Sequence, residues 1–222
     1  MATEDESSAK RPPVGPEGVA PEAFFAAYAR DRAQDANWET RRPQPQVLAL
    51  ADRGAFGEPM LDLGCGTGEN AIALAQRGMR VCAVDLVPQA IEYARERAAA
   101  TLGAHHGIEF LVADALTLPA ALPGRIFDTV LDSAVFHVFS DDDRARYRDS
   151  VNGVTRVGSK LYIIVFSTQE SREVGPRKVD GVEIAQAMAP NWQLVAAEPC
   201  RYHTNRHEGG GVAICAALMR VQ

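Results

Sequence analysis

The sequence MLDLGCGTGEN, residues 60–70, decides the fold of this chain. Its apolar beginning, residues 60–63, predicts a short buried parallel strand, and the run AIALAQR at 71–77 predicts a helix. Three glycines stand at alternate positions between the two elements: Gly64, Gly66 and Gly68. A strand, a glycine-rich turn and a helix in this order open the ligand crevice of a doubly wound α/β sheet, at the carboxyl end of its first strand. The length of 222 residues suits one such domain.

The spacing of the glycines indicates which kind of ligand the turn holds. A dinucleotide-binding turn has the pattern G-x-G-x-x-G and holds a pyrophosphate at the helix N-terminus. Here the pattern is G-x-G-x-G, and Glu69 stands where the third glycine of the dinucleotide pattern would be. The Glu69 carboxylate disfavours a diphosphate by like-charge repulsion, whereas Asp62 adds a carboxylate suited to an ammonium group. The turn therefore predicts a ligand with a cationic or zwitterionic end.

The run LDLGCGTG, residues 61–68, closely resembles the signature motif of class I methyltransferases that use S-adenosylmethionine (SAM). This resemblance implies a seven-stranded, mostly parallel, Rossmann-like sheet whose last strand is inserted antiparallel. It also implies SAM as the methyl donor and S-adenosylhomocysteine as the product. Two other classes stay open: a nicotinamide-dependent enzyme, against which the glycine spacing and Asp62 speak, and a SAM-binding protein without catalysis.

Two further acids extend the predicted cofactor site. Asp85 ends the second predicted strand, 21 residues after Gly64, where a carboxylate accepts hydrogen bonds from ribose hydroxyls. In class I methyltransferases an acid after the third strand holds the adenine, and Asp114 fits that position, although it could instead cap the next turn. The complete set of predicted cofactor contacts is Trp38, Asp62, Gly64, Cys65, Gly66, Gly68, Asp85, Leu86, Asp114, Ala115, Asp132 and Ser133.

The residues before the first strand predict a tail and a covering segment. Residues 1–20 are rich in Pro, Gly, Ala, Ser and Glu and predict a flexible tail, followed by one domain from 21 to 222. Within that domain, residues 21–45 carry aromatic side chains at helical spacing, which either pack on the domain or form a lid. Trp38, followed by Pro-Gln-Pro, is similar to small-molecule methyltransferases of the thiopurine, thiol/halide and bacterial heterocycle groups, in which this segment folds over cofactor and substrate. Arg42 departs from that pattern, because relatives often have glycine there.

The end of the fourth predicted strand, residues 127–133, carries the candidate catalytic residues. In this fold the end of strand four borders both the sulfonium and the acceptor, and the pattern D-S-x-x-F-H resembles the same small-molecule group. His137 is the candidate general base or orienting residue, unless its ring only packs on the cofactor, and Asp132 is the second catalytic candidate. The predicted substrate contacts are Phe24, Phe25, Tyr28, Phe136, His137 and Arg172.

Composition narrows the partners and the compartment. The chain has 23 basic and 29 acidic residues and a net charge of −6, which argues against nucleic acid as a partner. The four cysteines lie far apart, the N-terminus is acidic, and no apolar run reaches about 18 residues, so we expect a reduced, cytoplasmic protein without a membrane span. We see no clustered acid and histidine set for a metal. The oligomeric state is left as a monomer or homodimer.

Together these features predict transfer of the SAM methyl group to a small aromatic or heterocyclic molecule by in-line displacement. The sequence does not choose among a ring nitrogen, a hydroxyl and a thiol as the acceptor atom. A thiol/halide methyltransferase of the detoxification type and a non-catalytic SAM-binding protein remain the alternatives.

Overall fold

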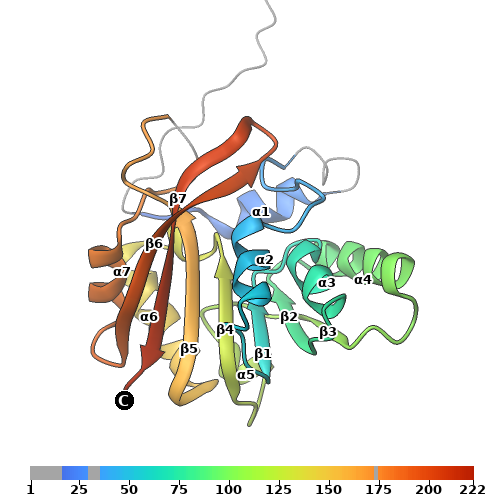
Figure 1. Ribbon diagram of the computed structural model, residues 1–222, viewed down its shortest axis with the longest axis horizontal. Helices are drawn as coiled ribbons and strands as arrows, with labels where there is room; N and C mark the ends of the chain where they lie inside the picture. Colours follow the sequence, from blue (N-terminus) through green and yellow to red (C-terminus); the bar gives the residue numbers. More distant parts are fainter. Residues whose placement is uncertain (1–16, 30–35, 173–174) are drawn as a thin grey trace, which may run out of the picture.

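In this computed structural model, which describes residues 17–29, 36–172 and 175–222, seven strands form one sheet in the order β3-β2-β1-β4-β5-β7-β6 (Figure 1). The strands are β1 (Met60–Leu63), β2 (Val81–Asp85), β3 (Ile108–Val112), β4 (Phe127–Ser133), β5 (Thr155–Phe166), β6 (Trp192–Thr204) and β7 (His207–Arg220). Strands β1 to β5 pair in parallel, and β7 runs antiparallel to both β5 and β6. The predicted doubly wound α/β fold with an inserted antiparallel last strand is confirmed.

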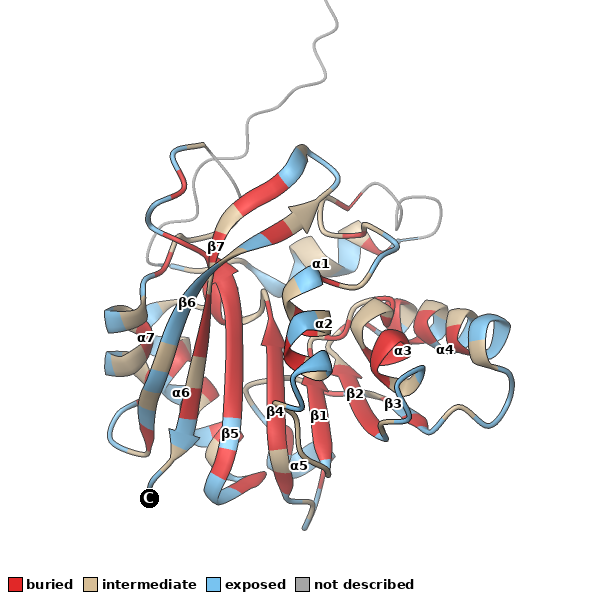
Figure 2. Ribbon diagram, in the orientation of Figure 1, coloured by how far each residue is buried: buried red, intermediate tan, exposed pale blue. Residues whose placement is uncertain are grey.

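Helices cover both faces of the sheet, and each face has its own apolar core. The helices of one face are α2 (Pro45–Asp52), α3 (Glu69–Ala75) and α4 (Pro88–Leu102), and those of the other are α5 (Leu118–Ala121), α6 (Asp141–Asn152) and α7 (Gly181–Met188). Because successive strand residues point to opposite faces, Met60 joins the first core and Leu61 the second. Figure 2 shows the central strands buried along most of their length, as expected for a sheet covered on both sides.

The β6–β7 hairpin is longer than the sequence predicted. The polar, glycine-rich sequence of residues 201–211 predicts a connection between two strands, but β6 extends to Thr204 and β7 begins at His207. Tyr202 pairs with Gly211 and Thr204 with His207, so the ladder continues to the tip. Backbone pairing of this kind does not need apolar side chains, and the polar tip rises above the carboxyl edge of the sheet (Figure 1).

The N-terminal segment lies across that same edge. The helix α1 (Pro21–Ala27) starts with the predicted proline, and just before it Val19 donates a backbone hydrogen bond of 2.8 Å to the Val138 carbonyl. A Cβ placed on Gly18 would lie 2.6 Å from the Ser140 nitrogen. The tail predicted over residues 1–20 therefore ends earlier than expected, since residues 18 and 19 are packed. Residues 1–16 lie outside the described part of the chain.

Two side chains tie the N-terminal segment to the β6–β7 hairpin. The Gln44 amide accepts from the His203 N–H at 2.8 Å and donates to the His203 carbonyl at 3.0 Å. At the hairpin tip the Asn205 N–H donates to the Asn37 carbonyl at 2.8 Å. These contacts join residues about 160 positions apart and place the Trp38 region beside the carboxyl edge of the sheet.

Candidate functional site

The glycine turn adopts a backbone that its sequence requires. Gly64, Gly66 and Gly68 have φ angles of 67°, 54° and 87°, a region that side chains rarely enter. A Cβ on Gly64 would lie 2.2 Å from Cγ2 of Val135, which follows β4, and a Cβ on Gly68 would lie 3.1 Å from Cβ of Ala94 on α4. The first glycine thus permits close approach of the β4 end, and the third permits close packing of two helices.

Asp85 holds this turn in place. Its carboxylate accepts from the Gly66 N–H and from the Val87 N–H, each at 2.9 Å. Burial raises the pKa of this carboxyl, and the two backbone donors oppose the rise. Asp85 therefore lies at the adjoining ends of β1 and β2, where the sequence placed it, and its contact with a ribose stays a prediction.

Asp62 is a buried carboxylate without a hydrogen-bond partner among the described residues. It is 1% exposed, and neither of its carboxylate oxygens makes a hydrogen bond of normal geometry. Burial raises its pKa to about 7, with further increases from Asp85, Asp132 and Glu69, while the Ala71 N–H lowers it. A cation beside this carboxylate would stabilise its ionised form, because the carboxylate is buried and surrounded by other acids. The position therefore fits the ammonium group predicted there.

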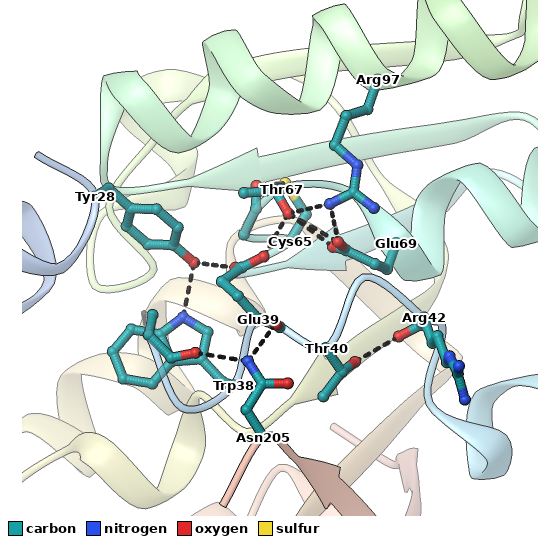
Figure 3. A network of polar contacts seen from close by, with 12 residues as sticks. Tyr28, Trp38, Glu39, Thr40, Arg42, Cys65, Thr67, Glu69, Arg97 and Asn205 are labelled. Atoms are coloured by element: carbon teal, nitrogen blue, oxygen red, sulfur yellow. Dashed lines mark hydrogen bonds and ion pairs between the residues drawn. The ribbon is translucent and has the colours of Figure 1, made fainter. Parts of the chain in front are cut away.

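A polar network joins the N-terminal segment to the glycine turn (Figure 3). The Trp38 indole N–H donates to the Tyr28 hydroxyl at 2.8 Å, and that hydroxyl donates to Glu39 at 2.6 Å. The other Glu39 oxygen lies 2.5 Å from the Thr67 hydroxyl inside the turn. Tyr28 also packs with Val87 at the start of α4. The structure thus brings the predicted Tyr28 and Trp38 over the turn. It adds Glu39 and Thr67, which the sequence analysis did not predict.

The sequence contains only weak indications that Glu39, Thr67 and Arg97 belong to the site. Glu39 directly follows the singled-out Trp38, and Thr67 lies within the glycine motif itself. Arg97, which contacts Thr67 and Glu69 from α4, is one of several basic residues on a helix surface. Their meeting depends on tertiary contacts between segments about 30 residues apart.

The Asp132 carboxylate is held by hydrogen bonds at the turn after β4. Its carboxylate accepts from the Tyr147 hydroxyl at 2.7 Å and from the N–H groups of Val135 and Phe136 at 2.9 and 3.0 Å. These partners lie toward α6, and Asp132 is fully buried among them. Asp132 thus caps the turn after β4, and its contact with the cofactor or the reacting atoms stays a prediction. Burial raises its pKa to about 6.

Phe136 also lies on the α6 side. It is 0% exposed, and its ring contacts Tyr147 edge-on with the Arg144 guanidinium 4.6 Å from its centroid. These contacts give Phe136 a packing role, and its contact with the acceptor stays a prediction. The next residue, His137, lies in the short 3₁₀ turn η2 (Phe136–Val138), and its side chain packs against Phe166 instead.

His137 and Ser133 mark a second group of buried side chains. The His137 ring stacks on Phe166 at the end of β5, with ring centroids 5.5 Å apart, and Phe166 in turn contacts Tyr202 of β6. Ser133 Oγ and His137 Nδ1 are buried without a hydrogen-bond partner among the described residues. Burial raises the pKa of the Tyr202 hydroxyl well above its usual range, and the nearby Ser133 hydroxyl opposes this rise without a hydrogen bond of normal geometry. Sequence reasoning missed Phe166 and Tyr202.

Burial changes the expected chemistry of His137. Its pKa is lowered to about 3, first by burial and then by the positive charge of Arg144. The imidazole is therefore neutral at physiological pH and a weak base. As placed here, His137 is better suited to orienting or packing than to removing a proton.

The remaining predicted residues have different surroundings. Asp114 accepts from the Leu116 N–H at 2.9 Å, as the alternative of a turn cap anticipated. The Arg172 guanidinium is bound to the Glu170 carboxylate and the Gly210 carbonyl, so it fastens its loop to β7.

The two phenylalanines of α1 differ in their surroundings. Phe24 contacts Trp38 with ring centroids 6.0 Å apart, whereas Phe25 is 45% exposed. The predicted contacts of Arg172 and Phe25 with the acceptor stay predictions. Leu86 and Ala115 are half-buried and Cys65 is buried.

Comparison with known proteins decides the family. A family model described as a methyltransferase domain matches residues 60–158, which span β1 to the start of β5. An uncharacterized methyltransferase of Schizosaccharomyces pombe is 31% identical over 126 residues, which make up 56% of this chain and 83% of that protein. The chain belongs to the SAM-dependent methyltransferases. Members of this family use SAM as the methyl donor.

Two other relatives cover more of this methyltransferase. The 2-heptyl-1-hydroxyquinolin-4(1H)-one methyltransferase of Mycobacteroides abscessus is 29% identical over 170 residues, 76% of this chain and 73% of that protein. A solved structure described as "Conversion of a Disulfide Bond into a Thioacetal Group during Echinomycin Biosynthesis" aligns with a TM-score of 0.79 and 28% identity. That alignment covers 90% of this chain and 91% of the other.

Two further findings concern the described part of the methyltransferase. No helix within residues 17–29, 36–172 and 175–222 is long and apolar enough to cross a membrane. Within the same ranges no three His, Cys, Asp or Glu side chains are grouped so that they could hold a metal ion.

Proposed function

We propose that this methyltransferase transfers the methyl group of SAM to a ring nitrogen, hydroxyl or thiol of a small aromatic or heterocyclic molecule. The observation that carries the proposal is the aromatic lining on both sides of the glycine turn. Tyr28 and Trp38 lie over the turn, and a second aromatic group consists of His137 after β4, Phe166 at the end of β5 and Tyr202 of β6. Aromatic walls with a few polar groups suit a flat ring system.

The likeness to the hydroxyquinolinone methyltransferase supports the same class of acceptor. That relative acts, by its name, on a flat heterocycle with a hydroxyl group, and it aligns over about three quarters of both chains. The net charge of −6 gives no support to a nucleic-acid acceptor. A small heterocycle therefore remains the best-supported acceptor.

Our proposal gives distinct roles to the residues of this chain. When bound, SAM supplies an electrophilic methyl group on a sulfonium, which is transferred by in-line displacement. In our proposal Asp62 binds the ammonium group, Asp85 binds the ribose, and the N-terminal segment excludes water from the turn. The acceptor lies beside Ser133 and His137, whose unpartnered Oγ and Nδ1 can each make one hydrogen bond to it. Positioning of this kind supplies most of the acceleration when the acceptor atom is already nucleophilic.

A sulfur acceptor is the second candidate. It is supported by the solved structure, whose description names a disulfide converted into a thioacetal, and by the resemblance to thiol/halide methyltransferases. A thiolate needs little help from a base, which agrees with a His137 imidazole whose pKa is lowered to about 3.

One assay separates these candidates. The protein is incubated with SAM and, separately, with 2-heptyl-1-hydroxyquinolin-4(1H)-one, an azole, an aromatic thiol and iodide. The readouts are S-adenosylhomocysteine and the mass of the product. We expect turnover of the flat heterocycles above the rate without acceptor. Turnover of only the thiol and iodide would favour the second candidate. SAM binding without any turnover would favour a non-catalytic protein.

We expect His137→Gln to lower kcat about tenfold without changing the shape of the pH–rate profile between about pH 6 and 8. The folded pKa of His137 is lowered to about 3, so this side chain does not change its charge in that range. The profile is measured with the best acceptor from the assay above, for wild type and variant in parallel. Loss of a titration step near neutrality, with a decrease of about 10²–10⁴ in kcat, would instead show that His137 acts as a general base.

A further inference from the structure

The Glu39 carboxylate connects the N-terminal segment to the glycine turn. One of its oxygens accepts from the Tyr28 hydroxyl at 2.6 Å, and the other lies 2.5 Å from the Thr67 hydroxyl (Figure 3). Tyr28 and Glu39 belong to the N-terminal segment and Thr67 to the turn. Glu39 is therefore the side chain through which the two segments share a continuous chain of hydrogen bonds.

This junction is buried, which makes each of its hydrogen bonds important. Tyr28, Glu39 and Thr67 are 3%, 7% and 4% exposed. Burial raises the pKa of the Glu39 carboxyl, with a smaller increase from Glu69. Loss of one member would leave the remaining polar groups buried and without a partner, which costs more than the bond itself contributes.

The neighbouring charge is already neutralised without Glu39. The Arg97 guanidinium forms an ion pair with Glu69 and donates to the Thr67 hydroxyl at 2.7 Å. Glu39, by contrast, receives hydrogen bonds only from hydroxyl groups in the described network. Its role in the junction is therefore that of a two-sided acceptor, which a neutral amide of the same shape can imitate.

The segment that carries Glu39 is also fixed from its other side. The backbone of Asn37 accepts from Asn205 at the hairpin tip, and the backbone N–H of Gln44 donates to the Asn70 side chain at 2.9 Å. Over the turn itself the fit is close: a Cβ on Gly66 would lie 3.0 Å from the Tyr28 hydroxyl and 3.2 Å from Glu39. The Glu39 side chain thus completes the cover at the position nearest the glycines.

We propose that Glu39 is a positioning residue that fastens the N-terminal segment to Thr67 and so keeps the cofactor enclosed during the reaction. A cofactor held by the glycine turn leaves only when this junction opens. The rate of SAM dissociation then reports the strength of the junction. The proposal rests on the family's use of SAM and on the aromatic cover described above, and it does not depend on the acceptor.

The test measures SAM dissociation by stopped-flow displacement, in the full chain and without acceptor. We expect Glu39→Ala to increase the dissociation rate about tenfold, in line with the loss of two buried hydrogen bonds. Glu39→Gln should stay within about threefold of wild type, because the amide still accepts from Tyr28 and can donate to Thr67. Glu22→Gln, which removes an exposed carboxylate from α1, serves as the matched control and should leave the rate unchanged.

A double-mutant cycle with Thr67→Val separates the junction from a general loss of stability. If Glu39 acts through Thr67, Glu39→Ala should have little further effect in the Thr67→Val background. Hydrogen exchange of the backbone provides a second readout: SAM should protect residues 36–40 in wild type and in Glu39→Gln but not in Glu39→Ala. Thermal unfolding of each variant shows that the sheet is intact.

Three results would overturn the proposal. Additive effects of the two substitutions would show that Glu39 and Thr67 do not act together. An unchanged dissociation rate in Glu39→Ala would show that the junction does not retain the cofactor. A loss in Glu39→Gln as large as that in Glu39→Ala, found for SAM but not for S-adenosylhomocysteine, would assign Glu39 an electrostatic role toward the sulfonium instead. Failure of wild type to bind SAM would contradict the proposed function rather than this inference.

Discussion

Asp62→Asn should stabilise the cofactor-free protein above neutral pH and at the same time weaken its affinity for SAM. The buried Asp62 carboxyl has its pKa raised from 3.8 to about 7, because it lacks solvent and hydrogen-bond partners and lies near Asp85 and Glu69. The folded state therefore holds a proton that the unfolded state releases, so stability falls as pH rises from about 4 to about 7. Above that window the ionised group costs up to about 4 kcal/mol.

The amide in Asp62→Asn removes this charge but remains a buried polar group. We expect a net gain of about 2 kcal/mol in the free energy of unfolding at about pH 8, and little gain at about pH 4. The affinity for SAM should fall about 10- to 100-fold, because a neutral amide replaces a carboxylate facing an ammonium group. Chemical denaturation at both pH values and calorimetry with SAM measure the two effects.

The control for Asp62→Asn is Glu96→Gln, which removes an exposed carboxylate from α4. It should change neither the pH dependence of stability nor the affinity for SAM. If the free energy of unfolding of Asp62→Asn equals that of wild type at both pH values, the Asp62 carboxyl is solvated in the folded protein. Unchanged affinity for SAM would show that Asp62 does not bind the ammonium group.

Gly64→Ala should reduce the affinity for SAM about 100-fold or more. Its φ of 67° is unfavourable for any side chain, and the added Cβ would lie 2.2 Å from Cγ2 of Val135. The turn or the β4 end has to move, and both border the proposed cofactor site. Calorimetry with SAM measures the loss, and thermal unfolding measures the accompanying destabilisation.

Gly54 offers a matched control because it has the same φ of 67° and nothing within 4 Å of an added Cβ. Gly54→Ala carries the same backbone strain, about 1–2 kcal/mol, without the collision, and should bind SAM normally. The double variant Gly64→Ala/Val135→Ala removes the colliding methyl group and should recover stability. Recovery of stability without recovery of SAM affinity would mean that the bare glycine itself approaches the cofactor. A normal affinity in Gly64→Ala would contradict the assigned turn.

The sequence by itself determined the fold and the position of the cofactor side. Strand, glycine turn and helix at residues 60–77 are local features, and local spacing is sufficient to specify them. Asp85 was found for the same reason, because the carboxyl ends of neighbouring parallel strands meet at one edge of the sheet. The hydrogen bond from Gly66 to Asp85 follows directly from that geometry.

Only the tertiary structure decided which side chains at the end of β4 share a face of the sheet with Asp62. Asp62 pairs in register with Leu131, so Ser133 shares its face of the sheet, whereas Asp132 points to the opposite face and Tyr147. Residue spacing within one strand gives alternation but not register between strands. The contact of Glu39 with Thr67 and the stacking of His137 on Phe166 likewise join residues 28 and 29 positions apart. No local pattern specifies such pairs, because they form only when separate elements pack against one another.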